Sequence, residues 1–399
     1  MNKTLILFTT AYPYQGGEQF LETEIEYLAN HFDKIIIVPA KNNNTLRKVP
    51  DNVYIDNFVA EANKSYFNRI KSIISRDFFN NITVDLSSNR YLAIHMFYIK
   101  KYKQWIRHFL KTEELDKCLF YTYWFSASTT ALSLVKNDVP TLKFVTRVHG
   151  GDLYENLHGF KEFPTRKKVI KNINKIFTIS DNGKSHLELK YPIPKNKITT
   201  SRLGIKPHGF LSTASVDGKL RIVSCSSLIP VKRVHLIVEA LEYLNGNDVE
   251  IIWTHIGDGK LRQAIEDQAK RTLGKNIAYN FLGVLPNNEV YAFYRDNPVD
   301  LFLNVSSSEG VPVSIMEAQS FSIPVIATDV GGNSEIVNDN NGSLLSASPS
   351  AKEIAKVLLY CYHNKENWNI KRKKSFDNWK HKYNANNNYL QFTKEIIKL

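Results

Sequence analysis

The chain of 399 residues has few cysteines and no long apolar segment. Its three cysteines, Cys118, Cys225 and Cys361, are odd in number and far apart, which excludes a disulfide framework and the spacing of a zinc site. This usage predicts a reducing compartment, the cytoplasm. No apolar run reaches the roughly 18 residues that a membrane-spanning helix needs, and residues 1–10 are too short and too polar for a signal peptide.

What the chain does have is an ordinary soluble composition with an excess of positive charge. Hydrophobic residues make up 43% and charged residues 23%, and the length predicts two or three domains with ample core. The formal net charge is +13, so we expect an anionic partner. Anionic lipid, nucleic acid and a phosphorylated substrate all satisfy that expectation.

Residues 299–337 contain the most informative pattern, which predicts a strand, a loop, a helix, a second strand and a loop. An apolar run over 300–305 is typical of a buried strand, and the turn residues 306–310 follow it. Pro312 suits the first turn of the next helix, where a missing N–H costs nothing. Two acids frame that helix start: Glu309 precedes it and Glu317 lies inside it, with seven residues between them.

This geometry has a chemical interpretation. Open α/β sheets bind ligands at the carboxyl ends of their strands, where Glu309 is expected. The N–H groups of Val311, Val313 and Ser314 have no intrahelical partner and suit a phosphate, and Glu317 could take two ribose hydroxyls. Glu309 would then face whatever is attached beyond the phosphates. The alternative is a surface helix whose acids serve the helix dipole and solubility.

The first half of the chain shows another α/β alternation with two candidate ligand loops. A strand over 4–8 leads to Gly16-Gly17 and a helix through Leu28, so the glycines could admit a ligand to the backbone or form a plain turn. Strands are also expected over 35–38, 118–124, 142–148 and 176–180. The third of these ends at His149, which is followed by two glycines and Asp152. His149 could reach a ligand there, or Asp152 could simply cap a helix.

Residues 99–111 have the pattern of a basic amphipathic helix that carries aromatic residues. Helices on membrane surfaces have this composition, and so do solvated faces that pack on a protein core. The sequence leaves both interpretations open.

A polar linker over 204–219 separates the two halves, and a second alternation follows with strands over 221–225, 249–253 and 277–282. Gly257-Asp258-Gly259 is not a dinucleotide fingerprint, because Arg262 occupies the third glycine position. Gly183-Lys184-Ser185 is not a phosphate loop, because Thr178 holds the place of the required glycine. The pattern predicts an α/β protein with two doubly wound domains that face each other across a cleft.

In this order the motifs resemble the retaining glycosyltransferases of family four, which have the GT-B fold of two Rossmann-like domains. The resemblance covers nearly the whole chain, although residues 40–115 match poorly. The acid pair at Glu309 and Glu317 is its specific part. The supporting pieces are Gly16-Gly17, His149-Gly150-Gly151-Asp152, Leu203-Gly204-Ile205, Lys232, Gly257-Asp258-Gly259, Gly283-Val284, Gly310-Val311-Pro312 and Gly331-Gly332-Asn333-Ser334-Glu335.

The resemblance implies a role for each matching residue. Glu317 would bind the ribose of a nucleotide diphosphate sugar, and Val284 and Leu285 would hold the base. His149 and Glu309 would be the catalytic residues, at the donor sugar. The remaining expected donor-binding residues are Gly16, Gly17, Asp152, Lys232, Arg233, Gly257, Gly310, Val311, Pro312, Val313 and Ser314.

One position departs from the family pattern. The family has an arginine five residues before Lys232, and here that residue is Ser227. Either Arg233 or Arg202 replaces it as the second phosphate cation, or the diphosphate site is weaker, because lysine lacks the bidentate guanidinium fork.

The resemblance also implies which segment of the chain binds which substrate. Residues 1–208 would bind the acceptor, residues 209–375 the nucleotide sugar, and residues 376–399 would form a helix that crosses back to the first domain. The expected reaction is metal-independent transfer of a hexose from a UDP- or GDP-sugar to a lipid-linked or polysaccharide acceptor. Bacterial capsule, exopolysaccharide or lipopolysaccharide assembly would be the pathway.

Three further expectations concern metals, location and alternatives. The chain has no Asp-x-Asp tripeptide, in keeping with a site without metal. The enzyme would be cytoplasmic, with peripheral contact to the anionic inner membrane through basic residues, and it would not bind nucleic acid. The alternatives are a nucleotide-sugar epimerase or hydrolase of the same fold and a non-catalytic nucleotide-sugar-binding protein.

Overall fold

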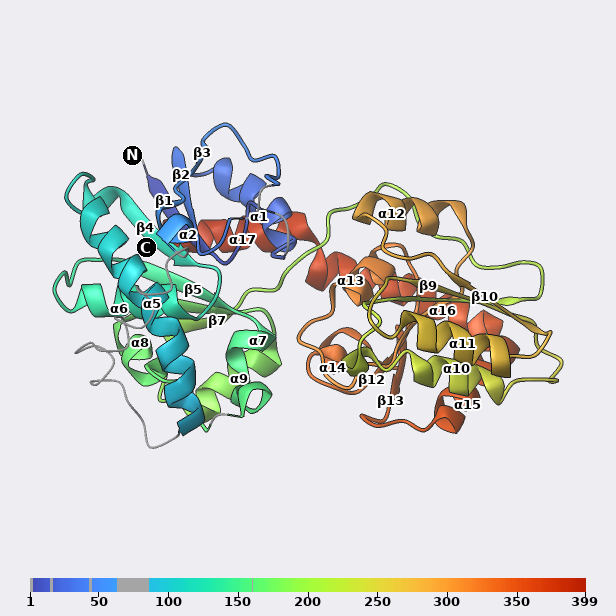
Figure 1. Ribbon diagram of the computed structural model, residues 1–399. Coiled ribbons are helices and arrows are strands. Elements are labelled where there is room, and N and C mark those ends of the chain that lie inside the picture. The colour runs from blue at the N-terminus through green and yellow to red at the C-terminus, as the bar shows by residue number, and fades with distance from the viewer. Residues whose placement is uncertain (1–2, 15–16, 43–44, 63–85, 160) are drawn as a thin grey trace. The chain divides into compact units, whose positions relative to one another are not determined.

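The computed structural model describes residues 3–14, 17–42, 45–62, 86–159 and 161–399 (Figure 1). The chain forms two compact units. Unit 1 comprises Met1–Leu203 and Ala385–Leu399, and unit 2 comprises Gly204–Asn384. Each unit contains one parallel β-sheet with helices on both faces.

Unit 1 has a seven-stranded sheet within the described residues, with the order β3-β2-β1-β4-β5-β6-β7 and every pair parallel. The order changes direction at β1, so β1 and β4 form the switch point where such sheets bind ligands. The strands are β1 (Thr4–Thr9), β2 (Lys34–Pro39), β3 (Val53–Ile55), β4 (Cys118–Thr122), β5 (Phe144–Val148), β6 (Lys175–Thr178) and β7 (Ile198–Thr200).

Two apolar layers enclose this sheet because side chains of a strand alternate between its faces. Ile6 and Phe8 of β1 pack on one face, while Leu5 and Leu7 pack on the other. The larger helices of the unit are α1 (Phe20–Ala29), α5 (Leu86–Phe109), α6 (Ala127–Lys136), α8 (Arg166–Asn172), α9 (Asp181–Lys190) and α17 (Ala385–Ile397), and the shorter ones are α2 (Phe58–Glu61) and α7 (Gly150–Leu153).

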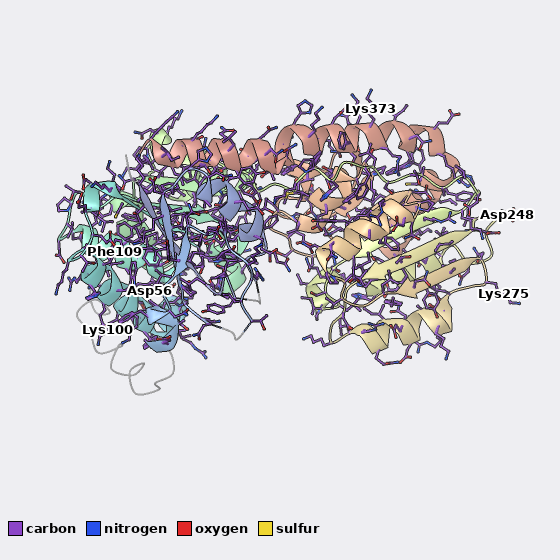
Figure 2. All side chains as sticks on the ribbon, turned by 90° about the horizontal axis from the view of Figure 1, so that it is seen from above. Asp56, Lys100, Phe109, Asp248, Lys275 and Lys373 are labelled. Atoms are coloured by element: carbon purple, nitrogen blue, oxygen red, sulfur yellow. The ribbon has the colours of Figure 1, made fainter. Side chains whose placement is uncertain are left out.

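Helix α5 contains most of the basic amphipathic stretch, and its aromatic side chains belong to the core. Tyr102, Trp105 and Phe109 are buried against Phe8 and its neighbours. Lys100, on the same helix, is exposed (Figure 2). The aromatic face therefore packs on the protein, and only the basic face remains for another partner.

The C-terminal helix α17 belongs to unit 1 because it completes one of the apolar layers. Phe392 lies under the Arg147 guanidinium, 4.2 Å from ring centroid to Cζ. Arg147 is fully buried, donates to Tyr121 Oη at 2.9 Å and pairs with Glu24 at 3.2 Å. A buried cation is tolerated only when such partners surround it, so α17 closes over a polar network in the core.

Unit 2 has a six-stranded parallel sheet within the described residues, with the order β10-β9-β8-β11-β12-β13 and a switch point between β8 and β11. Its strands are β8 (Leu220–Cys225), β9 (Ile251–Ile256), β10 (Ile277–Phe281), β11 (Leu301–Asn304), β12 (Val325–Thr328) and β13 (Gly342–Leu345). Its helices are α10 (His235–Glu242), α11 (Arg262–Thr272), α12 (Asn287–Asp296), α13 (Val313–Ser320), α14 (Asn333–Ile336), α15 (Ala351–His363) and α16 (Lys365–Asn378), followed by a π-helical turn over Trp379–Tyr383.

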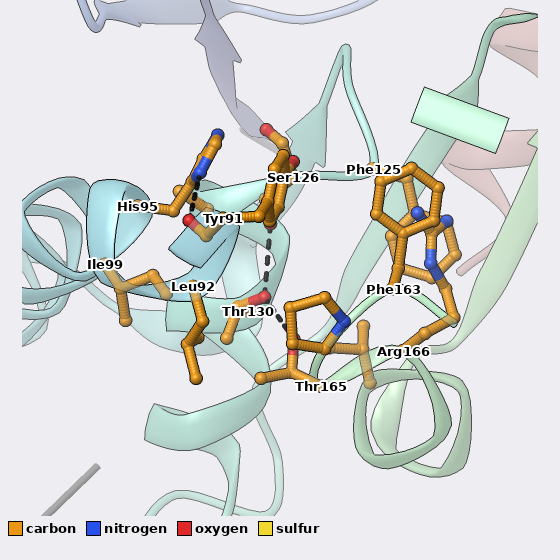
Figure 3. A pocket seen from close by; sticks show the side chains of 13 residues that line it. Tyr91, Leu92, His95, Ile99, Phe125, Ser126, Thr130, Phe163, Thr165 and Arg166 are labelled. Atoms are coloured by element: carbon orange, nitrogen blue, oxygen red, sulfur yellow. Dashed lines mark hydrogen bonds between the residues drawn. The ribbon is translucent and has the colours of Figure 1, made fainter. Parts of the chain in front are cut away.

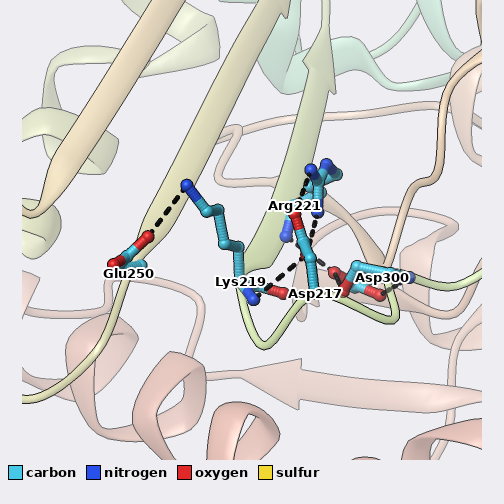
Figure 4. A network of polar contacts seen from close by, with 6 residues as sticks. Asp217, Lys219, Arg221, Glu250 and Asp300 are labelled. Atoms are coloured by element: carbon cyan, nitrogen blue, oxygen red, sulfur yellow. Dashed lines mark hydrogen bonds and ion pairs between the residues drawn. The ribbon is translucent and has the colours of Figure 1, made fainter.

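A polar network braces the amino-terminal edge of this sheet (Figure 4). Asp300 Oδ2 accepts hydrogen bonds from Ser215 Oγ and from the backbone N–H of Arg221, both at 2.7 Å. Lys219 pairs with Glu250 at 2.9 Å on the exposed surface. This network lies at the opposite end of the strands from the carboxyl edge.

Every strand expected from the sequence is present, within a few residues. Strands β3, β7 and β13 are not predicted by the sequence pattern, because they are short and lie at the outside of the sheets. The expected domain boundaries were residues 208 and 375, while the units divide after Leu203 and after Asn384. Within the described part of the chain, no helix has both the length and the hydropathy needed to span a membrane.

Candidate active site

A lysine–glutamate pair lies at the carboxyl edge of the sheet in unit 2. Lys232 Nζ is 2.6 Å from Glu309 Oε1, and Asn304 Nδ2 donates to the same oxygen at 3.2 Å. Lys232 ends a 3₁₀ turn (Pro230–Lys232), and Asn304 ends β11. The Glu309 side chain is 8% exposed and that of Lys232 is 24% exposed. The ammonium group is thus held by the pair yet remains accessible to an anion.

Two glycines after β12 hold the backbone of the Glu309 loop in place. A Cβ on Gly331 would lie 1.8 Å from the Glu309 carbonyl oxygen, and a Cβ on Gly332 would lie 2.3 Å from the Gly310 oxygen. The N–H of Gly332 donates to that Gly310 oxygen at 2.8 Å. Any larger residue would push the loop away, so these glycines fix where Glu309 stands.

The helix that follows this loop presents its amino terminus at the same edge. Helix α13 begins at Val313, and Pro312 precedes it in an extended conformation without a side-chain cap. The first N–H groups of a helix lack intrahelical partners and carry the positive end of its dipole. Val311 and Pro312 are buried, while Val313 and Ser314 are half-buried. This arrangement suits a phosphate group.

Glu317 lies one turn into α13 and is 6% exposed. Tyr291 Oη of α12 donates to Glu317 Oε1 at 3.0 Å. Burial raises the pKa of Glu317 to about 7, and the Tyr291 hydrogen bond acts in the opposite direction. The pKa of this carboxyl group is therefore close to neutral pH, and hydrogen-bond donors from a ligand would favour its ionised form. No pattern in the sequence pointed to Tyr291, since its partner lies 26 residues away.

The two arginines proposed as phosphate cations both have protein partners. Arg233 donates from Nε to the Val305 oxygen at 2.8 Å and from Nη2 to the oxygens of Ser306 and Ala347 at 2.9 and 3.0 Å. Its guanidinium thereby fixes the chain just after β11. Arg202, in unit 1, pairs with Asp181. Ser227, at the position of the missing arginine, is exposed.

The loops after β9 and β10 lie together beside this edge. Gly257 adopts φ +138°, and its N–H donates to the Gly283 oxygen at 2.8 Å. A Cβ on Gly257 would lie 1.9 Å from the Ser226 oxygen, so only glycine fits. Val284 is 76% exposed and Leu285 is half-buried, which leaves this loop open to a flat ligand.

In unit 1, His149 follows β5 at the carboxyl edge of the sheet. It is 8% exposed, and neither ring nitrogen has a hydrogen-bond partner in the described structure. The ring lies against Tyr123 and Trp124, with centroid distances of 4.6 and 4.5 Å. Burial, and then the Arg147 cation, hold the pKa of His149 well below its ordinary value. The imidazole is therefore neutral at physiological pH, and both of its buried ring nitrogens lack a hydrogen bond within the described structure.

The carboxylate of Asp152 accepts hydrogen bonds from backbone N–H groups at and near His149. Oδ1 accepts from the His149 N–H at 2.6 Å, and Oδ2 accepts from the Phe125 N–H at 2.5 Å. Burial raises the pKa of Asp152 to about 7, against opposing effects of Arg166 and of these N–H groups. Asp152 therefore joins the loops after β4 and β5. It does not occupy the N-cap position considered for it, because His149 is the N-cap residue of α7 and Asp152 lies inside that helix.

The glycine loop after β1 is organised by an acid that the sequence analysis did not single out. Gly16 lies outside the described residues, whereas Gly17 is exposed at φ +140° with open space around it. The next residue, Glu18, accepts hydrogen bonds from the backbone of the β1 loop and from the Trp124 indole. An acid directly after two glycines was the only available signal for this contact.

A cavity of about 310 Å³ opens beside Trp124 at the same edge of unit 1. Its walls combine aromatic and polar side chains, among them His95, Tyr98, Trp124, Ser126 and Ser128. His95 donates from Nδ1 to the Tyr91 oxygen at 2.8 Å, and its ring lies beside Tyr91, at the border of a smaller neighbouring pocket (Figure 3). Mixed walls of this kind suit a small polar ligand with apolar faces.

Comparison with known proteins agrees with this geometry. Residues 211–380 match the family described as glycosyl transferases group 1. This segment makes up most of unit 2, so unit 2 resembles the members of that family. The family resemblance found in the sequence is thereby confirmed. Within the described residues, no cluster of three or more histidine, cysteine, aspartate or glutamate side chains could hold a metal ion.

Two curated relatives carry names from polysaccharide assembly. The chain is 26% identical over 247 residues to the putative colanic acid biosynthesis glycosyltransferase WcaL of Escherichia coli K12, which covers 60% of each chain. It is 24% identical over 256 residues to the amylovoran biosynthesis glycosyltransferase AmsK of Erwinia amylovora, again with 60% of each chain covered. The match thus spans about 60% of the length of these relatives.

Solved structures resemble the whole chain in fold. The apo lipopolysaccharide outer core galactosyltransferase WaaB has a TM-score of 0.69 at 14% identity, with 99% of this chain and 100% of that chain covered. Anabaena HepE in complex with UDP has a TM-score of 0.65 at 14% identity and covers both chains fully. The fold class is therefore GT-B, as the sequence predicted.

Proposed function

We propose that this protein is a retaining glycosyltransferase that transfers a hexose from a nucleotide diphosphate sugar to a lipid-linked or polysaccharide acceptor. The observation that carries the proposal is the Lys232–Glu309 pair beside the uncapped start of α13, with Glu317 behind it. A cation, a helix start and a buried acid at one edge of the sheet provide for a diphosphate and a ribose together.

In this proposal unit 2 binds the donor. The ribose hydroxyls donate to Glu317, and the base lies against the loop of Val284 and Leu285. The diphosphate takes the N–H groups at the start of α13 and draws Lys232 from Glu309, which leaves Glu309 to bind hydroxyls of the donor sugar. As the phosphate departs, these fixed charges stabilise its negative charge. They supply this charge without a metal ion, so we propose a metal-independent reaction with a UDP- or GDP-sugar.

Transfer with retention places the acceptor on the same face of the sugar as the leaving group. The acceptor oxygen forms a bond to the anomeric carbon while the bond from that carbon to the phosphate oxygen breaks. The acceptor proton passes to the departing phosphate. Neutral His149, with two ring nitrogens free of protein partners, orients the sugar and stabilises the charge that develops on it.

Unit 1 binds the acceptor in this scheme. The cavity beside Trp124 has aromatic faces for a sugar ring and hydroxyl groups at Ser126 and Ser128 for its hydroxyls. The indole that lines this cavity also contacts His149, so a saccharide bound there would lie next to the reaction centre.

Location and pathway follow from charge and from the relatives. The exposed basic side of α5 and the net charge of +13 favour peripheral contact with an anionic inner membrane from the cytoplasm. The names of WcaL and AmsK favour exopolysaccharide or capsule assembly, and that of WaaB favours lipopolysaccharide assembly.

Incubation with a panel of UDP-, GDP- and ADP-hexoses tests the proposal. The panel would use a membrane lipid extract and oligosaccharides as acceptors, with mass spectrometry of the products. We expect one donor to yield a glycosylated acceptor whose anomeric configuration matches that of the donor by NMR. Donor consumption without transfer to any acceptor would indicate an epimerase or hydrolase, and donor binding without consumption would indicate a binding protein. Either result would overturn the proposed transferase.

A further inference from the structure

The carboxylate of Glu18 gathers four hydrogen-bond donors at the carboxyl edge of β1. Its Oε1 accepts from the Thr10 N–H at 2.7 Å and from Trp124 Nε1 at 2.6 Å. Its Oε2 accepts from the N–H groups of Ala11 and Tyr12 at 2.8 and 2.7 Å. Three of the four donors are the consecutive backbone amides of residues 10–12, so the loop after β1 wraps around one anionic side chain.

The backbone at Glu18 shows that the side chain is what matters there. Its φ is +54°, in the left-handed region that favours glycine and is uncommon for glutamate. A residue chosen for backbone shape alone would be glycine or asparagine. The four hydrogen bonds offset this unfavourable conformation and account for a glutamate at the position.

A short chain of contacts connects Glu18 to the candidate catalytic histidine. The Trp124 indole donates to Glu18, and its ring lies 4.5 Å from the His149 ring, tilted by 44°. Tyr123 packs on the same histidine at 4.6 Å. Neither nitrogen of His149 has a protein partner, so ring contacts and backbone bonds alone fix its orientation. Movement of Trp124 would therefore move His149.

We propose that Glu18 is a positioning residue for His149, acting through the Trp124 indole. The proposal rests on the proposed function, because it assumes that His149 serves the transfer reaction. Glu18 itself touches neither the donor nor the acceptor in this scheme. Its task is to hold the loop after β1 and the indole in one arrangement.

The chemistry of the site requires a carboxylate. All four partners are N–H groups, and an ionised carboxylate is an acceptor on both oxygens. Glutamine has the same shape but replaces one oxygen with an NH₂ donor, which would face two of these N–H groups without a hydrogen bond. Glu18→Gln is therefore a sharp test, since it keeps the size of the side chain and removes half of its acceptors.

The test compares Glu18→Gln with Glu22→Gln in the full chain. Glu22 lies four residues later, in the first turn of α1, is half-exposed and pairs with Arg47 at 3.0 Å, so it controls for the loss of one negative charge beside this loop. Trp124→Phe removes the indole donor but retains a ring beside His149. For each variant, donor turnover is followed as kcat, KM and a pH profile, and UDP binding is measured by thermal shift.

We expect Glu18→Gln to lower kcat roughly 100-fold, as small misplacements of reacting groups do, with donor KM and UDP binding unchanged. Loosening of Trp124 would let water reach His149, so the acid limb of the pH profile should move upward toward the ordinary histidine pKa. Trp124→Phe should show a smaller effect in the same direction, and Glu22→Gln none.

Three outcomes overturn or separate the claims. Wild-type kcat in Glu18→Gln overturns the positioning role, and so does a lower kcat that tracks lost stability with an unchanged pH profile. In contrast, a wild-type protein that neither binds UDP or another nucleotide nor turns over a donor contradicts the proposed function itself. The UDP readout on unit 2 thus distinguishes failure of the two proposals.

Discussion

The two units have similar sheets but fix their ligand loops by different means. In unit 2, glycines let backbone segments approach so closely that a Cβ would overlap a carbonyl oxygen, at Gly257 and at Gly331. In unit 1, carboxylates accept backbone N–H groups instead, at Glu18 and at Asp152. A loop held by glycines depends on backbone shape, whereas a loop held by a carboxylate depends on the acceptor atoms of one side chain and, at Asp152, on its protonation.

This difference makes unit 2 rigid around its charges and unit 1 sensitive to its surroundings. The glycines of unit 2 fix the backbone of Glu309 and of the loop after β8 that leads to Lys232, which suits groups that must stabilise a phosphate without rearranging. The acids of unit 1 hold aromatic rings around a histidine that has no hydrogen bond of its own on either ring nitrogen. Variants of each kind can sharpen or break the contrast.

The largest effect should come from Lys232→Met. This change removes the accessible cation beside the start of α13, and we expect kcat to fall by about 10²–10³-fold, as for other groups that stabilise a developing anion. Steady-state donor turnover measures it. Lys219→Met is the matched control, because Lys219 forms an exposed pair with Glu250 at the other edge of the sheet. If both variants lose activity equally, the site around Lys232 is not the donor site.

The next effect should be on folding, in Gly331→Ala. A Cβ there meets the Glu309 oxygen at 1.8 Å and the backbone has φ +54°, so we expect a loss of at least about 3 kcal/mol from strain and overpacking. Urea denaturation measures the loss. Gly246→Ala tests φ alone, since Gly246 has φ +71° with open space, and should cost only about 1–2 kcal/mol. Equal losses would show that close approach contributes nothing.

A pH effect should separate the carboxylate-held loops of unit 1. The pKa of Asp152 rises from 3.8 to about 7 in the folded protein. Between pH 3.8 and about 7 the folded state keeps a proton that the unfolded state has lost. The stabilisation that this proton provides is therefore fully present below pH 3.8 and is lost as the pH rises to about 7. In this window its slope approaches about 1.4 kcal/mol per pH unit.

Denaturation of Asp152→Asn across that window tests the linkage. The variant should lack this downward slope, while Asp248→Asn, at an exposed residue labelled in Figure 2, should retain the slope of the wild type. A variant at Asp152 with an unchanged pH dependence would mean that the carboxyl group titrates normally in the folded protein.

The smallest predicted effect is a proton released on nucleotide binding. Burial raises the pKa of Glu317 to about 7, and ribose hydroxyls that donate to it would favour the ionised form. Below that pH the binding of UDP should release up to one proton. The affinity for UDP should therefore fall as the pH is lowered, by less than about tenfold per pH unit. Calorimetry in buffers of different ionisation enthalpy measures the release, which Glu317→Gln should abolish.

The donor side of this account could be predicted from the sequence because its residues lie on one strand–loop–helix segment. Glu309 and Glu317 are close in sequence, and Lys232 and the glycines stand in loops that follow apolar strands. Their partners could not be found in this way. Asn304 was hidden within a strand, Tyr291 lies 26 residues from Glu317, and Trp124 lies 106 residues from Glu18.

Two other features depended on packing rather than pattern. The periodicity of the aromatic residues of α5 fits a membrane surface and a protein core equally well. Their packing against the neighbouring sheet shows that they belong to the core. Arg233 follows Lys232 and seemed suited to a phosphate, but three backbone oxygens engage its guanidinium. A residue type predicts the chemistry available at a position, whereas its neighbours determine how that chemistry is used.

The most direct test of the central claim is a thermal-shift comparison of the wild type and Glu317→Ala with UDP, GDP, ADP and CMP. A nucleotide at about 100 times its dissociation constant adds about 2.7 kcal/mol to the unfolding free energy. We predict that one diphosphate raises the melting temperature of the wild type and that Glu317→Ala loses this shift. A full shift in the variant, or none in the wild type with any nucleotide, would contradict a donor site built on Lys232, Glu309 and Glu317.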